Sequence, residues 1–127
     1  MGRGSGRKTG ALGRQAEDAA YRYLLDRGLQ PVARNFRRRS GEIDIVMLDG
    51  DSLVFIEVRY RRNASFAPPA LTVDGQKQRR IVRTAALFAA AHRRLSRCVM
   101  RFDVVAVERG NRVRWIRDAF RPDDSTL

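Results

Sequence analysis

The sequence predicts a single α/β domain in which a mixed β-sheet is flanked by helices. Two segments, about 11–28 and 75–95, repeat apolar or small residues at nearly 3.6-residue spacing, which indicates amphipathic helices. Two others, 42–48 and 52–60, are rich in branched and aromatic residues and flank a turn, which is typical of a β-hairpin. One strand before this hairpin and two after the second helix give the order α-β-β-β-α-β-β.

The first helix is expected over 11–28, and a short strand at about 31–36 follows it. Gly28 stands where the C-terminal cap of a helix is expected. The residues that form the apolar or small stripe of this helix are Leu12, Ala16, Ala19, Ala20, Tyr23 and Leu24.

The hairpin comes next, around the turn Asp49-Gly50-Asp51. Both of its strands are apolar at nearly every position, so both faces of the sheet should be covered. One face is expected to receive Ile43, Ile45 and Met47 together with Val54, Ile56 and Val58. The other is expected to receive Val46, Leu48, Leu53 and Phe55, followed at one end by the charged residues Glu42, Asp44, Glu57 and Arg59.

The second half of the chain is expected to begin with a loop at 61–74. The second helix should run from about Gly75 to Leu95, and two last strands at 101–108 and 112–117 should share a turn at Gly110-Asn111. The expected domain organisation is a flexible basic arm at 1–10, one domain over 11–120 and a frayed tail at 121–127.

The charge of the chain favours an anionic partner. The net charge is +12 and the isoelectric point about 11.4, which on a compact domain favours a polyanion: DNA, RNA or an acidic membrane surface. Nucleic acid, with DNA first, is the expectation, and the alternative is a basic surface that only keeps the protein in solution. No apolar run approaches the roughly 18 residues of a membrane span, so no membrane partner is expected and a cytoplasmic location is the default. The arginine clusters expected to hold phosphates without reading base sequence are Arg34, Arg37, Arg38, Arg39, Arg61, Arg62, Arg79 and Arg80.

The hairpin also carries the candidate chemistry, in Asp44 and Glu57. A Gly-Asp turn would set these residues opposite one another and an Asp-Gly turn would set them diagonally, in both cases on one face within about 8 Å. A loop of odd length would separate them onto different faces, because a slip of one residue flips every side chain. Two neighbouring carboxylates repel each other, and a divalent cation such as Mg²⁺ or Mn²⁺ removes that cost. The alternative is that Glu42 and Glu57 simply pair with Arg59 and Arg61 at a solvated strand end.

A resemblance adds to this interpretation. The strings Gly41-Glu42-Ile43-Asp44 and Phe55-Ile56-Glu57-Val58-Arg59 resemble the core motif of PD-(D/E)XK nucleases. More narrowly, the chain resembles the YraN-like family of predicted bacterial endonucleases, which are distantly related to archaeal Holliday junction resolvases. The likeness covers roughly residues 11–109 and also includes Gly13, Ala16 and Glu17, Arg34-Asn35-Phe36-Arg37, Lys77 and Arg101-Phe102-Asp103-Val104-Val105.

The resemblance implies a restriction-endonuclease-like fold and a nuclease that uses Mg²⁺ or Mn²⁺, with branched DNA as one candidate substrate. Asp44 and Glu57 would be metal ligands, with the Val58 carbonyl as a third, and Glu17 would be an accessory acid from the first helix. Asp103 is expected to order the sheet or a basic neighbour rather than to bind metal. Resolvase relatives act as dimers, so the analogy also suggests a homodimer.

One position departs from the motif, because Arg59 stands where the motif has lysine. Arginine stays protonated and cannot act as a general base, although it can hold a phosphate or stabilise an anionic transition state. Either Arg59 performs this electrostatic role, or Lys77 supplies an ammonium group from the second helix. Lys77 lies one turn before Ile81 and should therefore point toward the sheet. The third reading is a nuclease-like fold that binds nucleic acid without cleaving it.

Overall fold

The computed structural model describes residues 10–61 and 73–122, and it confirms the predicted order of elements. The elements are α1 (Ala11–Asp26), β1 (Gln30–Arg38), β2 (Gly41–Asp49), β3 (Ser52–Arg61), α2 (Gly75–Ala91), the short 3₁₀ helix η2 (Arg93–Leu95), β4 (Val99–Glu108) and β5 (Arg112–Phe120). The strands form one mixed sheet in the order β1-β2-β3-β4-β5, in which only the β3–β4 pair is parallel. The expectations for the N-terminal arm, most of the 61–74 loop and the end of the tail fall largely outside the described residues.

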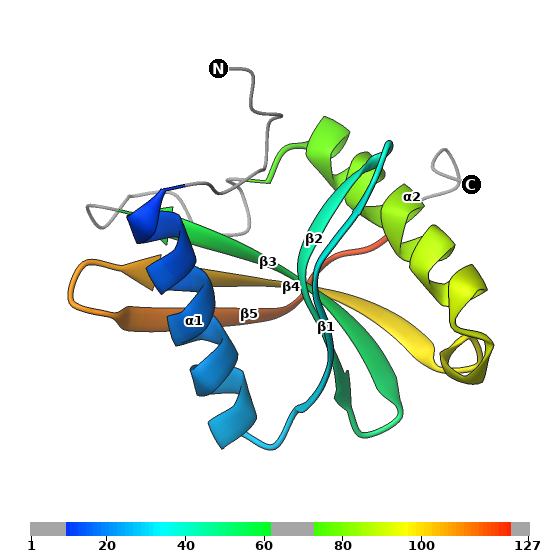
Figure 1. Ribbon diagram of the computed structural model, residues 1–127, viewed down its shortest axis with the longest axis horizontal. Helices are drawn as coiled ribbons and strands as arrows, with labels where there is room; N and C mark the ends of the chain where they lie inside the picture. The colour runs from blue at the N-terminus through cyan, green and yellow to red at the C-terminus, as the bar shows by residue number, and fades with distance from the viewer. Residues whose placement is uncertain (1–9, 62–72, 123–127) are drawn as a thin grey trace.

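The two long helices cover opposite faces of the sheet (Figure 1). Alternate residues of β3 show this division, since Val54 and Ile56 pack in one core cluster and Leu53 and Phe55 in the other. The first cluster contains the buried stripe of α1, and the second contains the buried stripe of α2. The sheet is therefore covered on both faces, as its apolar strands predict.

Helix α1 ends two residues earlier than the sequence predicts, and Gly28 explains where it stops. The Gly28 amide donates to the Leu25 carbonyl at 3.0 Å, and the Leu29 amide donates to the Leu24 carbonyl at 3.2 Å. This is the hydrogen-bond pattern of a Schellman cap, which needs a left-handed residue, and Gly28 has a φ of 91°. The cap directs the chain immediately into β1.

The β2–β3 turn settles which register the hairpin adopts. Asp49 pairs with Ser52, so the loop consists of Gly50 and Asp51 alone, and Gly50 has a φ of 59°. The even-length loop places Asp44 and Glu57 at facing positions. The regular pairing stops one step earlier, at Ile45 and Ile56.

The prediction for Ile43 was wrong, because this residue packs with the α2 cluster and not beside Ile45. The neighbouring strand gives the reason. The pairs Arg34–Ile45 and Phe36–Ile43 bracket Asn35, which has a φ of 54°. A left-handed residue interrupts the regular alternation of a strand. The irregularity lies at the level of Asp44.

Helix α2 also ends early, at Ala91 rather than Leu95. His92 leaves the helical region, with φ −127° and ψ 76°, and the chain then forms η2. The last two strands are longer than predicted, and the turn at Gly110 and Asn111 is present with both residues at positive φ. None of the helices within 10–61 and 73–122 is long and apolar enough to cross a membrane.

Candidate functional site

Asp44 lies where strands β2 and β3 begin to separate. Its side chain is buried, with 1% of the residue exposed, and its Oδ2 atom accepts a hydrogen bond of 2.8 Å from the Val58 amide. The carboxylate therefore lies against the β3 main chain, next to Glu57, just beyond the last regular pair of the hairpin. Figure 1 shows the two strands spreading apart from the centre of the sheet.

Glu57 is also buried, and it reaches toward α2. It follows Phe55 on the α2 side of β3, and the Lys77 Nζ atom lies 2.7 Å from its Oε2. Lys77 occupies the first turn of α2, where its amide donates to the N-cap carboxylate of Asp74 at 2.8 Å. The cap fixes the start of the helix, and this directs the lysine onto Glu57.

Arg59 contacts the same carboxylate from the next position on that face of β3. Its Nη1 atom lies 3.5 Å from Glu57 Oε2, and its side chain is 28% exposed against 15% for Lys77. Both cations considered from the sequence therefore reach Glu57. The lysine makes the shorter and more buried contact.

Glu17 approaches from α1 and is held by Asn35, a residue to which sequence reasoning assigned no role. The Asn35 Nδ2 atom donates to both carboxylate oxygens of Glu17, at 3.1 and 3.3 Å, and lies 3.4 Å from Glu42 Oε2. Arg34 also lies 3.5 Å from Glu17. Asparagine is one of the few residues that readily adopt positive φ. An asparagine inside a strand was therefore the sequence feature that could have indicated a left-handed residue here.

The donor set limits how a metal ion could be held. Among residues 10–61 and 73–122, no group of three or more His, Cys, Asp and Glu side chains is arranged to hold an ion. Asp44 and Glu57 offer the hard oxygen donors that Mg²⁺ and Mn²⁺ prefer, so the chemical type of these two ligands fits either ion. Two carboxylates leave most of an octahedron to main-chain carbonyl, water and phosphate oxygens.

Asp103 has the ordering role that the sequence predicts. It is fully buried and accepts two hydrogen bonds of 2.9 Å from Arg101, one from the Trp115 indole and one from the Asp118 amide. The hydrogen bond to Asp103 raises the pKa of Arg101, which also contacts Asp49 at 3.0 Å. These contacts hold β4 to β5 and to the hairpin turn.

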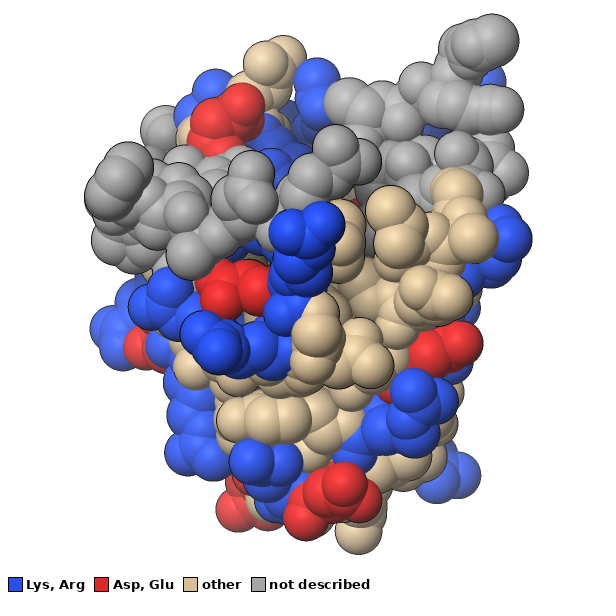
Figure 2. Space-filling view, turned by 90° about the vertical axis from the view of Figure 1, so that its left-hand side faces the viewer, with Lys and Arg blue, Asp and Glu red and all other residues tan. Residues whose placement is uncertain are grey.

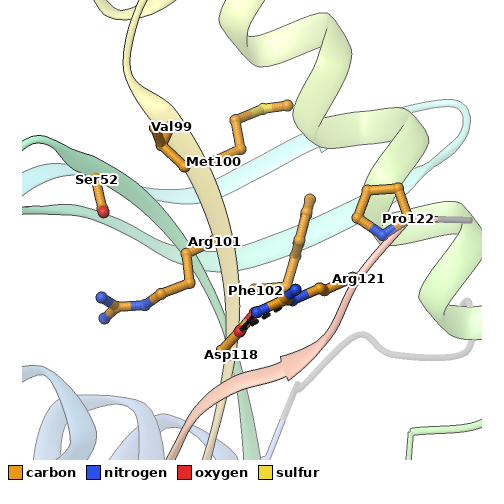
Figure 3. A pocket seen from close by; sticks show the side chains of 8 residues that line it. All are labelled: Ser52, Val99, Met100, Arg101, Phe102, Asp118, Arg121 and Pro122. Carbon is orange, nitrogen blue, oxygen red and sulfur yellow. Dashed lines mark hydrogen bonds and ion pairs between the residues drawn. The ribbon is translucent and has the colours of Figure 1, made fainter.

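A cavity of about 470 Å³ lies at this end of the sheet (Figure 3). Ser52, Met100 and Phe102 line it, and so do Asp118 and Arg121, which form an ion pair with each other. That pair lowers the pKa of Asp118 through its hydrogen bond to Arg121. The cavity is separate from the carboxylate pair, because Ser52 lies five positions before Glu57, or about 17 Å along an extended strand.

The arginines predicted to bind nucleic acid fall into different environments. Arg34 and Arg37 are paired with the carboxylates of Asp18 and Glu42. Arg61 is buried and lies 2.7 Å from Glu108, so its guanidinium is not presented to a partner as the prediction requires.

The remaining predicted arginines lie mainly at the surface. Arg38 covers the Phe36 ring, Arg39 and Arg79 are exposed and Arg80 is partly exposed, whereas Arg62 is outside the described residues. Figure 2 shows basic side chains spread over one face of the molecule, with acidic ones between them.

Comparisons with known proteins match most of the chain. The family model described as "Uncharacterised protein family UPF0102" matches residues 16–107, a range that contains Glu17, Asp44, Glu57 and Lys77. A UPF0102 protein of Stutzerimonas stutzeri (strain A1501) is 46% identical over 111 residues, which cover 85% of this chain and 92% of the relative. One from Xanthomonas campestris pv. campestris (strain B100) is 50% identical over 113 residues, covering 88% and 93%. One from Coxiella burnetii (strain RSA 493 / Nine Mile phase I) is 44% identical over 111 residues, covering 87% and 92%.

Proposed function

The chain belongs to the UPF0102 family, and we propose that it is a metal-dependent nuclease that hydrolyses phosphodiester bonds in nucleic acid. The observation that carries the proposal is the contact of Lys77 with Glu57 at 2.7 Å, beside the buried carboxylate of Asp44. Two acids and one ammonium group are the set that the PD-(D/E)XK motif combines. In this proposal Lys77 supplies the ammonium group from α2. Arg59 can therefore stand where the motif has lysine.

The carboxylates of Asp44 and Glu57 would hold Mg²⁺ or Mn²⁺, with the Val58 carbonyl as a further ligand. A divalent cation bound there supplies Lewis acidity and a water molecule of lowered pKa. The buried position of both acids favours this role, because removal of two anions from water is costly unless cations offset their charge.

Lys77 and Arg59 have different tasks in this proposal. The Lys77 ammonium can donate to a non-bridging phosphate oxygen and so stabilise the charge that develops in the transition state. Arg59 is more exposed and always protonated, which suits it to hold a neighbouring phosphate of the chain. Glu17, held by Asn35, supplies further negative charge from the α1 side.

The test is a cleavage assay on labelled single-stranded, duplex, nicked and branched substrates, with Mn²⁺ and with EDTA. The variants are Asp44→Asn and Glu57→Gln, and Asp26→Asn is the matched control, since it removes one carboxylate from the exposed end of α1. Asp44→Asn keeps an oxygen that can accept the hydrogen bond from the Val58 amide. A loss of cleavage in this variant therefore comes from the removal of the negative charge. We expect the two site variants to lose cleavage and the control to retain it. Equal cleavage by all four proteins would identify a contaminating nuclease and refute the proposal.

A second candidate is a nucleic-acid-binding domain that does not cleave. The observation that favours it is that both acids already have partners, Asp44 in the Val58 amide and Glu57 in Lys77. A binder of this kind would give no metal-dependent product with any substrate. Its affinity would instead fall steeply with salt and would be insensitive to Mn²⁺.

A further inference from the structure

The described arginines lie in different environments. Those on the sheet mostly face carboxylates, as the ion pairs of Arg37, Arg61 and Arg101 illustrate. The arginines that follow the C-terminal end of α2 do not face carboxylates. Within residues 10–61 and 73–122, no carboxylate lies within ion-pair distance of Arg93, Arg94 or Arg97, and all three are exposed.

The chain holds these three arginines on a tight turn. After α2 ends at Ala91, η2 is closed by the Ser96 hydroxyl and amide, which both donate to the Arg93 carbonyl, at 2.7 and 3.2 Å. The Cys98 amide then donates to the Leu95 carbonyl at 3.1 Å. Arg93, Arg94, Ser96 and Arg97 line an open cavity of about 430 Å³. Three arginines therefore line one concave surface.

We propose that Arg93, Arg94 and Arg97, the arginine corner, form a second phosphate-binding site for the backbone of double-stranded nucleic acid. This inference rests on the proposed function. Like charges brought together without counter-ions repel each other, and a phosphate backbone relieves that repulsion while it releases its own counterions. Guanidinium also matches phosphate in a bidentate geometry that an ammonium group cannot provide.

The length of α2 sets the span between the two sites. Sixteen positions (93 minus 77) separate Lys77 from Arg93 along α2 and its end, which at ~1.5 Å each is about 24 Å. At ~3.4 Å per base pair this corresponds to about seven base pairs. The arginine corner therefore engages a duplex arm that extends at least this far from the bond at Glu57 and Lys77, and it does so without reading sequence.

The test compares two triple variants of equal charge. Arg93→Gln/Arg94→Gln/Arg97→Gln removes the arginine corner, and Arg22→Gln/Arg109→Gln/Arg112→Gln removes three exposed arginines from α1, the β4–β5 turn and the start of β5. Each changes the net charge from +12 to +9 (12 minus 3). Fluorescence anisotropy in EDTA measures the binding of 6- and 24-base-pair duplexes between 50 and 200 mM salt. EDTA keeps cleavage out of the measurement.

We expect the corner variant to bind the long duplex more weakly and with a salt slope smaller by about 2.7, or ~0.9 for each lost contact. The ratio of parent to variant affinity then shrinks about 40-fold from 50 to 200 mM salt. The short duplex should bind both proteins almost equally. Single Arg94→Gln and Arg97→Gln variants, each with about a third of the slope change, replace the triple if it does not fold.

Three results would overturn the inference. The control triple could lose as much affinity as the corner triple, the short duplex could be affected as much as the long one, or anionic phosphatidylglycerol vesicles could bind the parent while duplex does not. Failure of the nuclease proposal is a separate result. It appears as an absence of cleavage in Mn²⁺ while the corner-dependent loss of duplex binding persists.

Discussion

The Nζ atom of Lys77 lies 2.7 Å from the Oε2 atom of Glu57, which joins the first turn of α2 to the middle of β3. The glutamate is almost fully buried, and the lysine is partly buried, with 15% of its side chain exposed. Such an ion pair is costly to break from one side only, because the buried carboxylate loses its 2.7 Å contact and keeps the longer one of 3.5 Å to Arg59. The pair therefore has consequences for stability that can be measured apart from any activity.

Lys77→Met should lower the free energy of unfolding by about 3 kcal/mol, as expected when one partner of a buried pair is removed. The double variant Lys77→Met/Glu57→Gln should recover part of this loss, since the buried charge of Glu57 is removed together with its partner. Arg59→Met is the matched control and should cost less than about 1 kcal/mol, because its contact is longer and more exposed. Urea denaturation measures these three and the single variant Glu57→Gln, and losses of the two single variants that simply add in the double variant would contradict a coupled pair.

Asn35 gives a second prediction, which separates backbone from side chain. Its φ of 54° is strained for alanine by about 1–2 kcal/mol but not for glycine. Both substitutions also remove the amide that donates to Glu17, a bond to a charged group worth roughly 1.5–3 kcal/mol. Asn35→Gly should therefore be destabilised by the lost amide alone, and Asn35→Ala by clearly more.

The measurement is thermal or urea unfolding of the two Asn35 variants beside the parent protein. Asn111→Ala and Asn111→Gly form the control pair, because Asn111 has a φ of 61° in the β4–β5 turn and is exposed. Equal stability of the alanine and glycine variants at position 35 would show that its backbone carries no strain.

The hairpin could be predicted from the sequence because its determinants are local. A run of apolar residues on each side of Gly50 and Asp51 defines the strands. The even number of residues in the loop then determines which residues face one another. The position of Lys77 could be inferred in the same way, from its place one turn before Ile81 on the buried side of α2.

Other features depend on contacts between distant parts of the chain. Ile43 packs on the other face of the sheet, beside the place where Asn35 of the paired strand is left-handed, and no local pattern in β2 signals that change. The sequence predicts that Arg61 holds phosphate, but it is buried and pairs with Glu108, 47 positions away, across the parallel β3–β4 pair. Parallel pairing brings together residues that sequence proximity cannot connect.

The pair of Arg61 and Glu108 supports a third prediction. Both side chains are about 8% exposed and their charged atoms lie 2.7 Å apart. Arg61→Met should cost about 3–5 kcal/mol, because Glu108 then keeps, among the cations of 10–61 and 73–122, only a longer contact of 3.9 Å to Arg114. Arg61→Met/Glu108→Leu should regain most of this loss, as apolar groups of similar size often replace buried ion pairs without penalty. Urea denaturation would contradict the assignment if Arg61→Met unfolded like the parent protein.

The last prediction concerns metal binding and needs no substrate. If Asp44 and Glu57 hold Mn²⁺, the ion binds the folded state and raises its stability by about 2.7 kcal/mol at a concentration 100 times its dissociation constant. Asp44→Asn and Glu57→Gln should remove this stabilisation, and Asp26→Asn should keep it. Lys77→Met should increase it, because an ammonium 2.7 Å from Glu57 competes for the position that a cation would take. Thermal unfolding with Mn²⁺ and with EDTA measures the difference, and an equal Mn²⁺ effect in all five proteins would place the ion elsewhere on the molecule.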